Sequence, residues 1–161
     1  MHVFMTGGTG FVGKAIALRL LRDGHTVSIW TRRPDEAPAI VGGDVELADA
    51  RSGTETLVSE LERADAVINL AGESVVSRWT AKRKEKLRRS RVDLTRDLVD
   101  AMGKCSQPPR ILLSASAVGF YGSDTEARFD EDSPAADDFL ARLCVDWEAA
   151  TEPASARGAR T

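Results

Sequence analysis

Residues 7–13 of this 161-residue chain read Gly7-Gly8-Thr9-Gly10-Phe11-Val12-Gly13. The stretch directly follows an apolar, strand-like run at residues 3–6 and opens a helical pattern over residues 12–22. In this context the first glycine permits a tight turn, the next lets a pyrophosphate approach the backbone, and the last lets the helix pack on the strand. The N–H groups of the first helical turn then face the phosphates. We therefore predict a dinucleotide on residues 7–13; the alternative is a turn of the same shape that binds nothing.

The rest of the chain alternates between short apolar runs and helical patterns. Further strand-like runs occupy residues 26–31, 45–48, 66–70 and 110–114, and helical spacing covers residues 54–63, 81–102 and about 138–151. Such alternation is typical of right-handed βαβ units and predicts an α/β fold, a Rossmann-like doubly wound parallel sheet. Residues 122–138 are polar, acidic and contain proline, which indicates a loop and not a domain boundary.

The end of the second strand indicates which dinucleotide is bound. Sites for NAD(H) usually place a carboxylate there to accept from the ribose 2′-hydroxyl. Here the strand runs into Thr31-Arg32-Arg33, with no carboxylate before Asp35. Guanidinium groups pair well with a 2′-phosphate, so we predict NADP(H) in preference to NAD(H). The alternative is that Arg32 and Arg33 are solvated loop charges.

Composition narrows the class of protein. The chain is 42% hydrophobic and 29% charged, with a formal net charge of −3 and two cysteines without a ligand-like cluster. We therefore expect a cytoplasmic protein with no metal site, no membrane partner and, since the apolar run starts at Val3, no leader. Residues 82–91 carry seven positive charges against Glu85 alone. A solvated helix face explains that run better than nucleic-acid binding, because no recognition motif accompanies it.

Two further motifs follow the predicted fourth and fifth strands, Asn69-Leu70-Ala71-Gly72 and the stretch from Ser114 to Gly122. Together with the glycine turn they resemble the extended short-chain dehydrogenase/reductases. Residues 69–74, 78–80, 90–92 and 139–148 narrow the resemblance to the branch of epimerase family proteins, or nucleoside-diphosphate-sugar epimerases. The resemblance covers essentially the whole chain, but family members run to about twice this length.

The resemblance implies strand order 3-2-1-4-5 and makes residues 1–161 an NADP(H)-binding Rossmann domain. In the family a sixth strand and a C-terminal substrate domain follow. It also implies a homodimer of the full-length protein, joined through the helices near residues 81–102 and 138–151. For the cofactor, the resemblance implies that the Gly72 turn lies beneath the adenosine ribose. It also implies that Asp49 contacts the adenine amine, with Asp44 as the competing candidate for that contact. Asn69 is equally explained as a strand-end turn residue.

The resemblance also exposes a departure in the catalytic residues. Short-chain dehydrogenases use a Tyr-x-x-x-Lys pair on one helix, in which the lysine lowers the tyrosine pKa. Here Leu140 and Cys144 take those two positions, and Arg91 replaces the helical asparagine. Ser116 matches the family serine, and Tyr121 is the other candidate catalytic residue.

We therefore predict an NADP(H)-binding, epimerase- or reductase-like protein with an atypical active site. Its expected partner is an unidentified small molecule, either a nucleotide sugar or a small carbonyl compound. The alternative is a non-catalytic protein that senses NADP(H) or serves as a scaffold. Cys144 lacks a neighbouring histidine, so a buried, inert thiol is the better interpretation of it than a nucleophile.

Overall fold

Five parallel strands form the centre of the computed structural model, which describes residues 1–124 and 126–161. The strands are β1 (His2–Thr6), β2 (Thr26–Thr31), β3 (Glu46–Asp49), β4 (Ala66–Asn69) and β5 (Ile111–Ser114). They are hydrogen-bonded in the order β3-β2-β1-β4-β5, and every neighbouring pair is parallel. The predicted α/β class, parallel sheet and strand order are confirmed.

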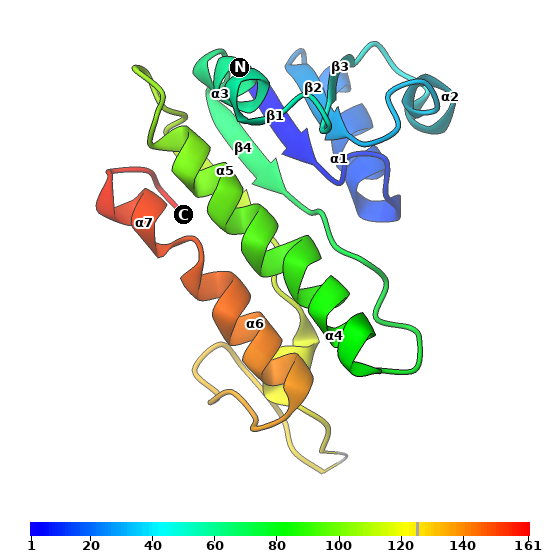
Figure 1. The fold of residues 1–161 in the computed structure, drawn as a ribbon, viewed down its shortest axis with the longest axis vertical. Helices are drawn as coiled ribbons and strands as arrows, with labels where there is room; N and C mark the ends of the chain where they lie inside the picture. Colours follow the sequence, from blue (N-terminus) through cyan, green and yellow to red (C-terminus); the bar gives the residue numbers. More distant parts are fainter. Residues whose placement is uncertain (125) are drawn as a thin grey trace.

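Helices cover both faces of the sheet. Alternate residues of each strand point to opposite faces, so the two helical layers pack against different residues of the same strands. One face carries Val3 and Met5 of β1 and packs against α1 (Phe11–Arg22) and α2 (Ala37–Val41). The other face carries Phe4 and packs against α3 (Thr54–Glu62), α5 (Leu94–Met102) and the short α7 (Glu152–Ala156). The strands β1, β2 and β4 therefore lie between two helical layers (Figure 1).

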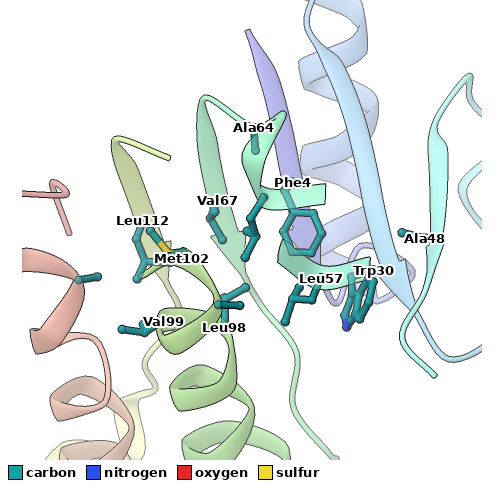
Figure 2. Packing of buried hydrophobic residues seen from close by; sticks show 13 residues of the cluster. Phe4, Trp30, Ala48, Leu57, Ala64, Val67, Leu98, Val99, Met102 and Leu112 are labelled. Atoms are coloured by element: carbon teal, nitrogen blue, oxygen red, sulfur yellow. The ribbon is translucent and has the colours of Figure 1, made fainter. Parts of the chain in front are cut away.

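The larger core cluster lies between the sheet and the α3–α5 layer. Figure 2 shows Phe4 and Trp30 on the sheet beside Leu57 of α3, with Leu98 of α5 close by. The Phe4 and Trp30 rings pack at a tilt of 44°, with centroids 6.1 Å apart. Within the part of the chain that the structure describes, no helix is both long enough and apolar enough to cross a membrane.

Residues 81–102 form one continuous helical rod, as predicted, but the rod is not uniform. It consists of α4 (Ala81–Arg88), a π-helical turn η1 (Arg89–Asp93) and α5. A π turn holds one residue more than the α-helical repeat, and such turns often mark functional positions. Helix α6 (Phe139–Ala149) packs beside η1 (Figure 1). It ends before Pro153, which stands in the first turn of α7.

The helices expected at a dimer interface turn their main apolar residues inward. Leu98 is 1% exposed in the sheet core, and Leu143 is 5% exposed in a smaller cluster with Trp147. Any interface on these helices would therefore use their exposed, largely polar sides. The homodimer stays a prediction.

A buried polar network joins the carboxyl ends of three strands to two helices. Asn69 accepts from Thr6 Oγ1 at 2.6 Å and donates to Thr95 Oγ1 at 2.8 Å and Ser114 Oγ at 3.2 Å. Trp147 Nε1 donates to the same Thr95 oxygen at 3.0 Å. Because unpaired buried polar groups are costly, this network holds β1, β4, β5, α5 and α6 in one relative arrangement.

Candidate functional site

The glycine turn between β1 and α1 is pressed against the chain that leaves β4. Gly7 has φ 70°, and a Cβ there would lie 2.7 Å from both the carbonyl carbon and the carbonyl oxygen of Leu70. A Cβ on Gly13 would overlap the Gly7 carbonyl oxygen and lie 2.8 Å from Gly8 Cα. Real Cβ atoms do not approach backbone this closely, so both positions require glycine.

The first turn of α1 presents backbone donors to the space above the sheet. Gly10 is the N-cap and supplies no side-chain cap, and the first turn holds no acidic residue. Within the described residues, the N–H groups of Phe11 and Val12 donate to no protein acceptor. Phe11 and Val12 are exposed by 98% and 57%. Uncapped donors at the positive end of a helix fit the pyrophosphate of a dinucleotide.

A groove of about 360 Å³ runs along the carboxyl ends of β1, β2 and β4. Its lining combines residues from the three predicted segments, namely Gly7, Thr9, Gly10, Thr31, Arg32, Arg33, Leu70, Ala71 and Gly72. Trp30, Ala50 and Leu94 complete the wall, with Thr6 at the base. Segments that are far apart in the sequence thus meet at one edge of the sheet, where open α/β folds bind their ligands.

Two arginines stand at the end of this groove. Thr31 Oγ1 accepts the Arg33 N–H at 3.2 Å, which orders the turn after β2. The Arg33 guanidinium pairs with Glu36 at 3.0 Å, and Arg32 lies 3.5 Å from a carboxylate oxygen of Glu73. Both arginine side chains are largely exposed, so their heads are free to reorient toward a ligand.

Glu73, which is not among the predicted site residues, contacts three cations. Besides Arg32 it meets Lys86 at 3.3 Å and Arg83 at 3.4 Å. Burial alone would raise the pKa of Glu73, but Lys86 and Arg32 outweigh burial and hold that pKa below its ordinary value. The only sequence signal for this cluster is its place directly after Gly72, opposite a basic helix.

The structure separates the two candidate aspartates. Asp49 lies at the carboxyl end of β3, beside the groove, whereas Asp44 precedes β3 and so lies at the opposite edge of the sheet. Asp49 binds Arg51 through both carboxylate oxygens, with Arg51 Nη2 at 2.7 Å. The hydrogen bonds from Arg51 hold the Asp49 pKa below its usual value.

Seven of the sixteen predicted cofactor residues do not line the groove, namely Gly8, Phe11, Val12, Gly13, Asp49, Asn69 and Ser114. Asn69 is 1% exposed, and its amide group is engaged by the buried network, as is the hydroxyl of Ser114. Gly8 packs on Ile29, and Gly13 packs inside the turn. The Asn69 and Ser114 side chains therefore order the ends of β4 and β5, and their contact with the cofactor stays a prediction.

Comparisons with known proteins identify relatives of this chain. The model of the NAD dependent epimerase/dehydratase family matches residues 3–142. This chain belongs to that family. It is 38% identical over 162 residues to the epimerase family protein YfhF of Bacillus subtilis, covering 100% of this chain and 52% of that protein. The chain spans about half the length of the curated relatives it matches.

Two solved structures are similar to this chain in fold as well as in sequence. The human epimerase family protein SDR39U1, crystallised with NADPH, superposes with a TM-score of 0.73 at 32% identity, over 93% of this chain and 48% of that one. A nucleoside-diphosphate sugar epimerase from Corynebacterium glutamicum gives a TM-score of 0.74 at 36% identity, over 99% of this chain and 32% of that one.

In this epimerase/dehydratase-family chain, the segment that follows β5 packs against helix α6. Ser116 Oγ donates to the carboxylate of Glu148 on α6. Leu140, on the first turn of the same helix, packs against Gly119. Cys144 Sγ lies 3.7 Å from the carbonyl oxygen of Ala117. The serine is thus paired with a carboxylate, and the helix offers no tyrosine or lysine at these positions.

Tyr121 lies in the 3₁₀ turn η2 (Val118–Tyr121) and is held by other aromatic rings. Its ring stacks on Phe129 at a centroid distance of 5.3 Å and meets the edge of Phe120 at 5.1 Å. Within the residues described, no lysine or arginine is hydrogen-bonded or ion-paired to its hydroxyl group. Among the described residues, Tyr121 thus has no bonded lysine comparable to the one in the family's Tyr-x-x-x-Lys pair.

Cys144 should react slowly with alkylating agents. The thiol is 4% exposed; burial raises its pKa, and the Glu148 carboxylate adds to the rise. A raised pKa leaves less thiolate at neutral pH, so we expect iodoacetamide at pH 8 to modify Cys144 at least about tenfold more slowly than free cysteine. Peptide mapping by mass spectrometry measures this rate, with urea-unfolded protein as the control. Equal rates in the folded and unfolded protein would contradict the expectation.

Proposed function

We propose that residues 1–161 are the NADP(H)-binding domain of an epimerase- or reductase-like enzyme with an atypical active site. The observation that carries this proposal is the single groove in which the uncapped glycine turn meets Arg32 and Arg33 without an acidic ribose anchor. The NADPH in the SDR39U1 crystal structure supports the same interpretation. The length of the relatives supports a further, substrate-binding domain in the intact protein.

Each part of the groove has a distinct task in this proposal. The Phe11 and Val12 N–H groups bind the pyrophosphate, and the Leu70–Gly72 segment lies beneath the adenosine ribose. Arg32 and Arg33 bind the 2′-phosphate. A nicotinamide cofactor held by these residues would supply hydride chemistry for a nucleotide sugar or a small carbonyl compound.

The proton that accompanies hydride transfer needs a positioned group, and Tyr-x-x-x-Lys is absent. We propose that Ser116 takes this place, with its hydroxyl oriented by the Glu148 carboxylate. A serine that donates to a carboxylate can pass a proton between the substrate oxygen and that carboxylate. Tyr121 is the second candidate, because it is the only tyrosine of the sequence.

Removing either arginine should change the cofactor preference. Arg32→Ala and Arg33→Ala each delete a cation for the 2′-phosphate, which should cost about 1.5–3 kcal/mol of NADPH binding free energy and leave NADH binding nearly unchanged. Calorimetry on the intact protein with both cofactors measures this. Arg22→Ala, which removes an exposed arginine at the end of α1, is the control. An unchanged NADPH-to-NADH affinity ratio in both variants would refute the assignment.

A non-catalytic, cofactor-sensing or scaffolding role is the second candidate function. It is favoured by Leu140 and Cys144 at the tyrosine and lysine positions, since neither residue can take over the paired acid–base step. A panel of carbonyl compounds and nucleotide sugars, followed by NADPH absorbance, separates the two. Oxidation of NADPH by any member identifies an enzyme. Tight NADPH binding without turnover across the panel favours the sensor.

A further inference from the structure

The groove continues into a second cavity of about 450 Å³ whose wall is rich in charge. The two cavities share Arg32, Ala71, Gly72 and Leu94, so they are two parts of one concave surface. The second part adds Lys86 and Arg89 from the basic rod, together with Glu73. Thus the basic helix, which sequence patterning assigns to solvent, turns part of its charge toward the proposed cofactor.

The Glu73 carboxylate holds two of these cations on its two oxygens. Arg32 Nη2 lies 3.5 Å from Oε1, and Lys86 Nζ lies 3.3 Å from Oε2. The Arg32 and Lys86 side chains are 77% and 56% exposed, whereas Glu73 is only 20% exposed. The Glu73 carboxylate thus lies between Arg32 and Lys86. A second anion that bound at that position would contact the same two cations.

The third partner of Glu73 is bound differently. Arg83 is 21% exposed and also donates to Ser77 Oγ at 2.9 Å and to the Ser74 carbonyl oxygen. These bonds fix Arg83 within the 73–83 segment. If Arg32 and Lys86 leave, Glu73 therefore still has a fixed cation, and its charge is not left unpaired.

We propose that Lys86 is a further binding residue for the 2′-phosphate, and that the phosphate takes Arg32 and Lys86 over from Glu73. The inference rests on the proposed binding of NADP(H). A phosphate monoester carries about −1.5 to −2 charges and three acceptor oxygens, against one charge and two oxygens for the carboxylate. The exchange therefore favours the phosphate, while NAD(H), which lacks that group, leaves the three ion pairs of Glu73 intact.

Asp93 and Asp97 line the far part of the same cavity. Asp93 is paired with Arg88 at 2.8 Å. Burial raises the pKa of Asp97, with the neighbouring Asp93 and Asp100 adding to the rise. These carboxylates lie on η1 and α5, beyond the α4 residue Lys86, and so the cationic end of the cavity is the end that adjoins Arg32.

The first test compares two lysines of the same helix. Lys86→Ala removes a cation that lines the cavity, and Lys82→Ala removes one that does not. In calorimetry on the intact protein, Lys86→Ala should weaken NADPH binding about tenfold and change NADH binding by less than about twofold. Lys82→Ala should change neither by more than about twofold. Equal effects of the two variants on NADPH would overturn the assignment of Lys86.

The second test neutralises the competing anion. Glu73→Gln keeps the side-chain shape and should tighten NADPH binding by about threefold to tenfold, because Arg32 and Lys86 no longer have to leave a carboxylate. Affinity for NADPH that is unchanged or weaker in Glu73→Gln would overturn the exchange. If the wild-type protein bound no NADPH, the proposed function would fall together with this inference. A preference lost in Arg32→Ala but kept in Lys86→Ala would refute the inference alone.

Discussion

Gly13→Ala should weaken NADPH binding by at least about 100-fold, because the added methyl group displaces the turn that presents two backbone donors. Each of these donors contributes about 1.5–3 kcal/mol to the binding of an anionic group. The methyl carbon would overlap the Gly7 carbonyl oxygen and lie 2.9 Å from the Gly7 carbonyl carbon. Those atoms are backbone and cannot move aside by a rotamer change. Gly7 in turn rests on Leu70, so the strain spreads to the other side of the groove.

Gly53→Ala separates loss of the turn from a general backbone effect. Gly53 has φ 87°, a methyl group there would meet no atom within 4 Å, and the residue precedes α3 on the surface. That variant should lower the free energy of unfolding by about 1–2 kcal/mol and leave NADPH binding unchanged. Calorimetry and urea denaturation on both variants measure the two quantities. NADPH affinity in Gly13→Ala within about threefold of wild type would show that the turn does not hold the cofactor.

Thr95→Val should be among the most destabilising isosteric changes available in this chain. Thr95 is 0% exposed, and its hydroxyl oxygen accepts from both Asn69 Nδ2 and Trp147 Nε1. Valine keeps the shape but offers no acceptor. Asn69 retains Ser114 as a partner, whereas the buried Trp147 N–H loses its acceptor, so we expect a loss of about 2–4 kcal/mol in the free energy of unfolding.

Urea denaturation followed by circular dichroism measures this loss. Thr54→Val, at the exposed first position of α3, is the matched control and should change stability by less than about 0.5 kcal/mol. A loss below about 1 kcal/mol in Thr95→Val would mean that the network is not a significant source of stability. The result bears on the site as well, because Thr6 at one end of the network also accepts the Ala71 N–H at 3.3 Å in the groove wall.

The features that depend on local patterns can be predicted from the sequence. The alternation of apolar runs with helical spacing predicts the five strands, and the spacing of Gly7, Gly10 and Gly13 predicts the turn before α1. Strand boundaries shift by one residue, as at β4, which ends at Asn69 and not at Leu70. The short helix α2 escapes prediction, because five residues carry too little periodicity to be recognised.

The features that depend on the path of the chain in space cannot be predicted from the sequence. The place of Asn69 after a strand suggests cofactor contact, but its partners come from three other elements whose register the sequence does not reveal. Glu73 and Lys86 are thirteen residues apart, and the sequence does not reveal that the chain after β4 lies against the rod so that the two side chains meet. Likewise, Glu148 reads as an ordinary exposed helix residue until the β5 exit places Ser116 beside it.

The π turn at Arg89–Asp93 determines in which direction the side chains of α4 point relative to those of α5. The wide turn absorbs one residue more than an α-helical turn does. Each α-helical residue advances the side-chain direction by about 100°, so if residues 89–93 were regular α-helix, the extra residue would rotate α4 by about that amount relative to α5. Leu87, which is fully buried, and Lys86, which faces the cavity, would both leave their present directions at once. Which side of α4 faces the cavity therefore depends on the wide turn at η1 as well as on the basic residues themselves, and substitutions within the basic run alone do not test that dependence.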